Sequence, residues 1–132
     1  MTEHGASARR LLIAIVILGT AGAAAAITPE EFRLRSGADY VALCATPASD
    51  PLYSSAVHMC HGFGAGTYQT IVAFTRHEKL EPLICPPEPV PSRNETVGRF
   101  LEWAKRNPQR LTEPAVELVA RFFITEFPCR PK

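Results

Sequence analysis

Four cysteines placed behind an apolar N-terminal leader limit the fold of this chain more than any other feature. The leader carries a basic pair, then apolar residues, then small residues, which is the order typical of a secretory signal peptide. In the oxidising compartment that such a leader addresses, an even number of cysteines indicates disulfide bonds. We therefore expect a small exported domain with two disulfides. The four cysteines are Cys44, Cys60, Cys85 and Cys129.

The predicted signal peptide spans residues 1–26. Its apolar core begins with the run from Leu11 to Leu18, and the alanines up to Ala26 provide the small side chains that a signal peptidase requires. Cleavage after Ala26 leaves a mature domain of residues 27–132 in the periplasm, without membrane attachment. The alternative is a retained anchor, because the apolar stretch of about 17 residues is close to the shortest length that crosses a bilayer.

The mature domain is formally neutral. Removing Arg9, Arg10 and Glu3 with the leader lowers the 14 basic and 13 acidic residues of the chain to 12 of each. Nucleic-acid binding depends largely on lysines and arginines that neutralise phosphates. A neutral domain without a basic stripe is therefore not expected to bind nucleic acid.

Four cysteines allow three pairings, and their number alone leaves all three open. We favour one bond between Cys44 and Cys60 and another between Cys85 and Cys129, because each then ties neighbouring helical segments of an antiparallel bundle. In the chain-entropy description the shorter loop contributes about 3 kcal/mol to stability and the longer one about 4 kcal/mol.

The predicted fold class is all-α, a small bundle of about four helices. Apolar residues recur at intervals of three and four in four segments that prolines separate. The proline-rich stretch from Glu81 to Pro91 predicts a stiff, extended connector before the third helix. The helical segments run from about Gly37 to Ala45, from Asp50 and Pro51 through Phe74, from Ser92 to just before Asn107, and from Thr112 to Phe127.

Polar residues at the predicted helix starts support these boundaries. Asp50 followed by Pro51 predicts an N-cap and a first helical residue for the second helix. Ser92 and Glu95 have the spacing of a capping box at the start of the third. Residues 94–96 also match a glycosylation sequon, which we interpret as part of the helix start.

Apolar residues assign a buried face to each of the longer helices. A surplus of apolar residues on the last helix indicates either a central helix or a face left for a partner. The second helix is expected to bury Val57, Cys60, Gly64, Ile71 and Phe74, and Trp103 of the third is expected in the core. The last helix is expected to bury Val116, Val119, Ala120, Phe123 and Phe127, with Leu118, Phe122 and Ile124 as the surplus.

Glycines interrupt the second helix, where each costs about 1 kcal/mol relative to alanine. We expect close packing of another helix to offset this cost along a stripe of small residues formed by Gly62, Gly66, Thr70 and Ala73. A phosphate-binding loop is the alternative, but no strand precedes the glycines and no Lys-Ser/Thr pair follows them.

Two polar clusters on the second helix contain side chains that occur in reactive sites. Asp50, Ser54 and His58 recur at four-residue intervals, but a catalytic triad also needs an orienting contact and an oxyanion hole. His58, Cys60 and His61 contain zinc-binding side chains, but structural zinc takes four ligands in recognisable pairs. We therefore expect no catalytic residue, no metal site and no cofactor.

A set of short motifs is distributed over the predicted helices and the connector. They are Cys44, Cys60-His61-Gly62-Phe63 with Gly66, Cys85-Pro86-Pro87, Leu101, Asn107-Pro108, Leu111, Pro114-Ala115 and Phe127-Pro128-Cys129. In this combination, from about Gly37 to Cys129, the chain resembles the Rap/Tai immunity proteins. Members of that family neutralise peptidoglycan amidases that bacteria deliver by type VI secretion.

The resemblance implies a periplasmic all-α protein that binds a toxin enzyme, occludes its active-site cleft stoichiometrically and forms a homodimer. It implies an amidase inhibitor and not an enzyme, and it identifies no toxin-binding residue. The alternative is a small periplasmic acid-stress or general binding chaperone of the HdeA type, which is also helical and disulfide-bonded. Two disulfides argue against that alternative, because they oppose the opening in acid that such a chaperone requires.

Overall fold

The described part of the chain consists of helices and loops. The computed structural model describes Met1 and residues 26–129, so the predicted signal peptide, apart from its two end residues, lies outside the described residues. Within residues 26–129 four α-helices form and no strand does, which confirms the all-α prediction for this part. They are α1 (Gly37–Cys44), α2 (Tyr53–His77), α3 (Arg93–Arg106) and α4 (Ala115–Glu126), with the 3-10 turns η1 (Glu31–Arg33) and η2 (Pro108–Arg110). No helix among these residues has the length and hydropathy of a membrane span.

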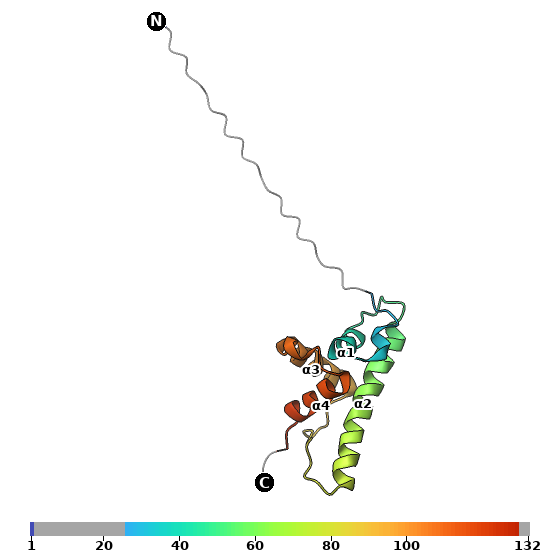
Figure 1. Cartoon of the computed structure of the whole chain (residues 1–132), viewed down its shortest axis with the longest axis vertical. Coiled ribbons are helices and arrows are strands. Elements are labelled where there is room, and N and C mark those ends of the chain that lie inside the picture. Colours follow the sequence, from blue (N-terminus) through green and yellow to red (C-terminus); the bar gives the residue numbers. More distant parts are fainter. Residues whose placement is uncertain (2–25, 130–132) are drawn as a thin grey trace.

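The short helix α1 lies at the centre of the bundle. It contacts α2, α3 and α4, and Figure 1 shows the long α2 beside the three shorter helices. The ring of Tyr40 lies 4.9 Å from that of Phe100, which in turn lies 5.4 Å from Phe122 of α4. Trp103 is buried against the same rings, as predicted. An aromatic cluster therefore forms the core where α1, α3 and α4 meet.

The first turn of α1 is held by the loop that precedes α4. The backbone N–H groups of Gly37 and Ala38 donate to the carbonyl oxygens of Glu113 and Leu111, at 2.8 and 2.9 Å. A Cβ at position 37 would lie 2.5 Å from the Cδ2 of Leu118. Only glycine therefore allows α1 and α4 to approach this closely.

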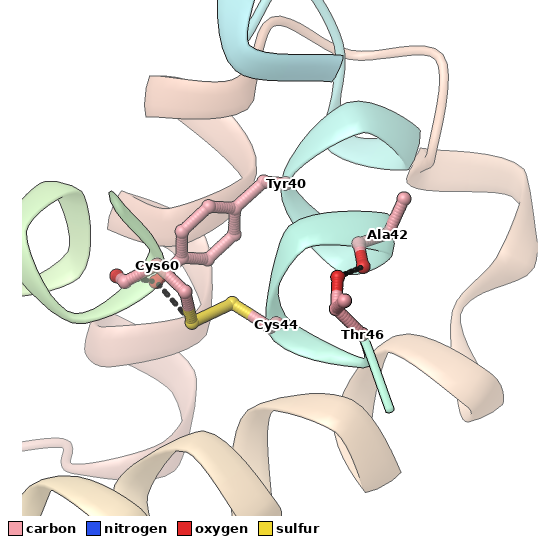
Figure 2. Close-up of a disulfide and its surroundings, with 5 residues drawn as sticks. All are labelled: Tyr40, Ala42, Cys44, Thr46 and Cys60. Atoms are coloured by element: carbon pink, nitrogen blue, oxygen red, sulfur yellow. Dashed lines mark hydrogen bonds between the residues drawn. A yellow bond between two sulfur atoms is a disulfide. The ribbon is translucent and has the colours of Figure 1, made fainter. Parts of the chain in front are cut away.

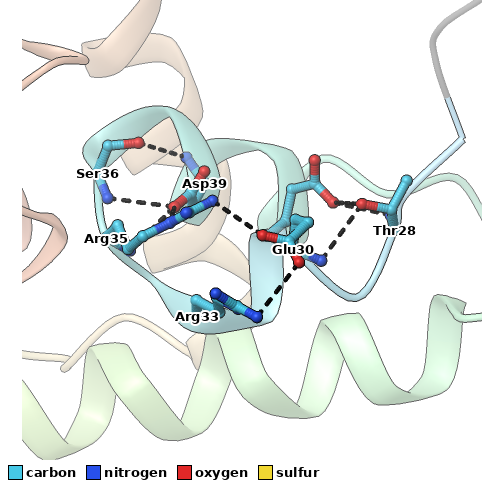
Figure 3. Close-up of polar contacts among 7 residues, drawn as sticks. Thr28, Glu30, Arg33, Arg35, Ser36 and Asp39 are labelled. Atoms are coloured by element: carbon cyan, nitrogen blue, oxygen red, sulfur yellow. Dashed lines mark hydrogen bonds and ion pairs between the residues drawn. The ribbon is translucent and has the colours of Figure 1, made fainter.

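Capping boxes begin two of the helices. The predicted box at α3 is confirmed: Ser92 Oγ accepts from Glu95 N–H at 3.2 Å, and Glu95 Oε2 accepts from Ser92 N–H at 2.7 Å. A second box, which was not predicted, joins Ser36 and Asp39 at α1. Figure 3 shows this second box beside the exposed ion pairs that Arg33 and Arg35 make with Glu30.

Helices α2 and α4 begin one to three residues later than predicted. Helix α2 begins at Tyr53, and Asp50 lies ahead of it: its Oδ1 accepts from Leu52 N–H at 2.8 Å and its Oδ2 from Ile27 N–H at 3.1 Å. Asp50 thus closes a turn ahead of the helix and holds the start of the described domain. Helix α4 begins at Ala115, with Pro114 as its N-cap residue.

The buried face of α4 differs from the predicted one. Leu118 and Phe122, which were assigned to surplus surface, are 0% and 1% exposed, whereas Val116, which was assigned to the core, is 52% exposed. Val119, Phe123 and Phe127 are buried as predicted. The reason is that α1 packs against the side of α4 that carries Leu118, a choice that helical periodicity alone cannot make.

The predicted helix packing along the small-residue stripe of α2 is wrong. Gly62, Gly66, Thr70 and Ala73 are all exposed, and a Cβ at Gly62 or Gly66 would meet nothing within 4 Å. Phe74, predicted as buried, is 59% exposed, because it lies near the end of α2 that extends past the other helices in Figure 1. Cys60 and Gly64 are buried as predicted, and Val57 and Ile71 are half-buried.

Both favoured disulfides are present in the structure. Cys44 bonds to Cys60 and joins the end of α1 to α2, while Cys85 bonds to Cys129 and joins the connector to the segment after α4. Figure 2 shows the first bond beside the ring of Tyr40, with Thr46 Oγ1 donating to the carbonyl oxygen of Ala42 just after α1. The two bonds therefore cross-link different segments of the domain.

Candidate functional site

An apolar groove of about 240 Å³ opens between α2, the proline connector and α3. Helix α4 forms its floor through Val119, Phe122 and Phe123. One wall comes from Gly64, Ala65 and Tyr68 of α2, and the other from Pro86, Val90 and Pro91 of the connector with Val97 and Phe100 of α3. We call this feature the α2–connector groove. It brings together residues that are far apart in the sequence.

Gly64 gives the groove its depth at the end nearest α1. Tyr40 reaches across from α1, and its hydroxyl donates to the carbonyl oxygen of Cys60 at 3.0 Å. A Cβ at Gly64 would lie 2.6 Å from that hydroxyl oxygen. Burial raises the pKa of Tyr40, because the phenolate would lose its hydration. Tyr40 therefore acts in this wall as a neutral hydrogen-bond donor.

Aromatic rings make the remainder of the groove rigid. Tyr68 packs against Phe123 with ring centroids 5.4 Å apart, and Phe122 lies 5.3 Å from Phe123. Such tilted pairs are favourable beyond the area that they bury. The walls are thus held by packing within the domain and do not depend on a bound partner.

The rim of the groove is polar and carries a positive charge. His61, Gln69, Arg93 and Thr96 are its polar lining residues, and none of the lining residues is an aspartate or glutamate. Among the ion pairs formed within residues 26–129, Arg93 takes part in none. The groove therefore combines an apolar interior with an exposed cation at its edge.

The connector wall is held in place by the Cys85–Cys129 bond. Next to this bond, Cys85 N–H donates to the carbonyl oxygen of Phe127 at 2.8 Å, and Ile84 forms an antiparallel bridge with Pro128. These contacts anchor one end of the proline-rich segment, and the capping box at Ser92 anchors the other. The position of this wall depends on bonds between segments that are 44 residues apart in the sequence.

The structure brings together only two of the three residues in the Asp50, Ser54 and His58 row. Ser54 Oγ lies 3.5 Å from His58 Nδ1, and that nitrogen lies 2.7 Å from the carbonyl oxygen of Ser54. The carboxylate of Asp50 instead accepts hydrogen bonds from the backbone N–H groups of Ile27 and Leu52. The exposed Ser54–His58 pair thus lacks an orienting carboxylate and lies outside the groove.

The His58, Cys60 and His61 cluster does not form a metal site either. The sulfur of Cys60 is bonded to Cys44, so it offers no thiolate. His58 bonds to its own helix, and His61 lies at the rim of the groove. Among residues 26–129 no group of three or more His, Cys, Asp or Glu side chains has the geometry to hold a metal ion.

The groove was not predicted from the sequence. Tyr68 follows Gly64 by four residues and therefore lies on the same helical face. This spacing was the one local feature of the sequence that places two groove residues together. The opposing wall comes from the connector and α3, whose approach to α2 depends on the path of the chain after Glu81. No spacing rule places those segments.

The family comparison agrees with the architecture. The sequence model described as Rap1a immunity proteins matches residues 36–129, which include all four helices and all four cysteines. This match confirms the resemblance to the Rap/Tai immunity proteins. No curated protein and no solved structure gives a match.

Proposed function

Because the chain belongs to the family of Rap1a immunity proteins, we propose that it protects the producing bacterium by binding an effector toxin and occluding its active site. The observation that carries the proposal is the match over residues 36–129, which covers the whole helical bundle. The protein acts by stoichiometric binding and not by turnover. It needs no cofactor for this task.

The proposed toxin is a peptidoglycan amidase delivered by type VI secretion. Peptidoglycan lies in the periplasm, so an inhibitor has to meet the amidase there. The predicted signal peptide of residues 1–26 would deliver the mature domain, residues 27–132, to that compartment. The disulfides support this location, because such bonds persist where the environment is oxidising.

The structure supports the proposal through rigidity. Two disulfides and a packed aromatic core limit the conformational freedom that binding would otherwise remove. Preorganisation of this kind increases affinity without any new contact. We also propose that the protein forms a homodimer, which is the usual state that the family resemblance implies.

Binding and inhibition are tested with purified components. The oxidised mature domain is titrated into a panel of type VI peptidoglycan amidases, and complex formation is followed by calorimetry while murein hydrolysis is measured in parallel. We expect one amidase to lose its activity at a near-equal molar amount of the domain. The proposal fails if the folded, oxidised domain inhibits no amidase of the panel.

The proposed compartment is tested separately in cells. The inhibited amidase is exported to the periplasm of a sensitive bacterium together with either the full-length chain or a chain without residues 2–26. We expect only the full-length chain to restore growth, because the amidase acts outside the cytoplasm. Equal protection by both forms would contradict a periplasmic site of action.

A further inference from the structure

We propose that the α2–connector groove binds an extended, apolar segment of the effector that carries a carboxylate next to its apolar side chains. This inference deepens the proposed function and rests on it in taking the effector as the partner. It assigns a binding surface and the chemistry of what the surface accepts. Three observations on the groove lead to it.

The size of the groove suits a short piece of a protein chain. A dry cavity of about 150 Å³ holds one benzene molecule, so about 240 Å³ has room for roughly two large apolar side chains. The groove is also open along its side, since Gln69 and Arg93 are exposed and Val90 is 61% exposed. A segment that belongs to a folded partner can therefore enter without threading.

The connector offers backbone acceptors to such a segment. Within residues 26–129 no hydrogen bond is formed by the backbone of residues 86–91, and four of these six residues are prolines, which carry no N–H group. The carbonyl oxygens of this wall are therefore free to accept from the backbone N–H groups of an extended chain. The pairing of an extended peptide with an exposed backbone edge through main-chain hydrogen bonds is a recurring mode of peptide recognition.

The positive charge of Arg93 at the rim restricts the charge of the segment that can bind. Arg93 is exposed, has no ion pair within the described residues and stands beside an interior without any carboxylate. A partner carboxylate at this position would gain a favourable contact and meet no repulsion from the groove. A basic side chain at the same place would be repelled. The segment that fits thus pairs apolar residues with an aspartate or glutamate.

The test uses two matched pairs of variants of the oxidised mature domain. Arg93→Glu reverses the charge at the rim, and Arg106→Glu makes the same change on α3 away from the groove. Ala65→Phe fills the groove, and Ala73→Phe adds the same ring to an exposed position of α2. Arg93→Glu is expected to fold, because an acidic residue is favourable in the first turn of a helix. Circular dichroism verifies the fold of all four variants.

Two measurements are made on each variant. The first is the dissociation constant for the amidase that the wild-type domain inhibits. The second is the dissociation constant for short random peptides selected on the wild-type domain from a displayed library. We expect Arg93→Glu and Ala65→Phe to weaken both by about tenfold or more, and the two control variants to change them less than about twofold. The selected peptides should contain neighbouring apolar and acidic residues.

The outcomes separate this inference from the proposed function. If the amidase is inhibited and the folded groove variants bind it as tightly as the controls do, the groove inference is overturned and the proposed function stands. If no amidase is inhibited but acidic apolar peptides bind and the groove variants abolish that binding, the groove is a peptide site and the proposed function fails. If neither the amidase nor any selected peptide distinguishes groove variants from controls, the inference is wrong.

Discussion

Tyr40 and Gly64 show how much a single contact constrains this domain. The hydroxyl of Tyr40 reaches the backbone of α2 only because position 64 has no side chain. Two neighbouring glycines, Gly62 and Gly66, lie on the same helix but meet open solvent. Three glycines of one helix therefore have different surroundings, and of the three only Gly64 is in close contact with another helix.

Gly64→Ala is predicted to destabilise the protein. The new Cβ would lie 2.6 Å from the Tyr40 hydroxyl oxygen, so the ring has to shift and its hydrogen bond to Cys60 is weakened. We expect the free energy of unfolding, measured by denaturant titration, to fall by about 1–3 kcal/mol. In a Tyr40→Phe background the penalty should largely vanish, because the nearest remaining ring carbon lies 3.8 Å away. An unchanged penalty in that background would contradict this account.

Gly66→Ala is predicted to act in the opposite direction. Its Cβ would meet no atom within 4 Å, so only the gain in helix propensity remains. We expect the free energy of unfolding to rise by about 0.5–1 kcal/mol in the same titration. Destabilisation by Gly66→Ala would indicate that the exposed stripe is covered, for example by a second copy of the chain.

At the scale of helices and connector, the two disulfides have different surroundings. Cys60 is 1% exposed and lies beside Tyr40, whereas Cys85 is exposed on the connector. The first bond joins two helices that also contact each other, and the second holds the connector next to the end of α4. The two disulfides should therefore differ in how readily a reductant reaches them and in how much the structure changes when each is reduced.

The Cys85–Cys129 bond is predicted to be reduced first. A soluble dithiol reaches the exposed Cys85 sulfur more readily than the buried Cys60 sulfur, so timed alkylation with mass spectrometry should label Cys85 and Cys129 before the other pair. A variant with alanine at both 85 and 129 should lose up to about 4 kcal/mol of stability. Earlier labelling of Cys44 and Cys60 would contradict the prediction.

Ser92→Ala is predicted to weaken the start of α3. It removes the acceptor for the Glu95 N–H group at the end of the connector and should cost about 1 kcal/mol in a denaturant titration. Ser54→Ala is the matched control, because Ser54 is exposed and its hydroxyl lies 3.5 Å from His58. The control should change stability by less than about 0.5 kcal/mol. Equal effects of the two changes would remove the case for the capping box.

For the whole molecule, several exposed carboxylates contribute to the response to acid. Hydrogen bonds with Thr28, Ser92 and Lys105 lower the pKa values of Glu31, Glu95 and Glu102 below 4.5. A carboxyl group whose pKa is lower in the folded state stabilises that state above its unfolded pKa. This contribution disappears as the pH falls through the folded pKa.

The acid response provides a prediction that also separates an immunity protein from an acid-stress chaperone. The free energy of unfolding should stay nearly level above about pH 5 and decline below about pH 4.5, as followed by denaturant titrations across pH. The oxidised domain should bind no hydrophobic dye at low pH. Dye binding at low pH, with helices retained and tertiary packing lost, would support the chaperone alternative.

Local features of the sequence predicted the elements better than their packing. The proline positions and the Ser92–Glu95 pair located α3 closely, and Trp103 was correctly assigned to the core. The contact between Asp50 and Ile27, which is 23 residues away in the sequence, was not predicted. Contacts between residues so far apart in the sequence cannot be predicted from the spacing of neighbouring residues.

Although the sequence left three cysteine pairings open and only the structure decided between them, the sequence by itself determined the helical class, the approximate helix boundaries and the family. These properties follow from hydrophobic periodicity, from proline and capping residues and from short motifs. All of these features can be read from residues that are close together in the sequence. Only the tertiary structure decided that Leu118 and Phe122 face the core and that the stripe at Gly62 and Gly66 faces solvent. It also decided that α2, the connector and α3 enclose a groove. The physical reason is that burial depends on which helix packs on which face, and a helix apolar on two sides, such as α4, permits either choice until its neighbours are in place.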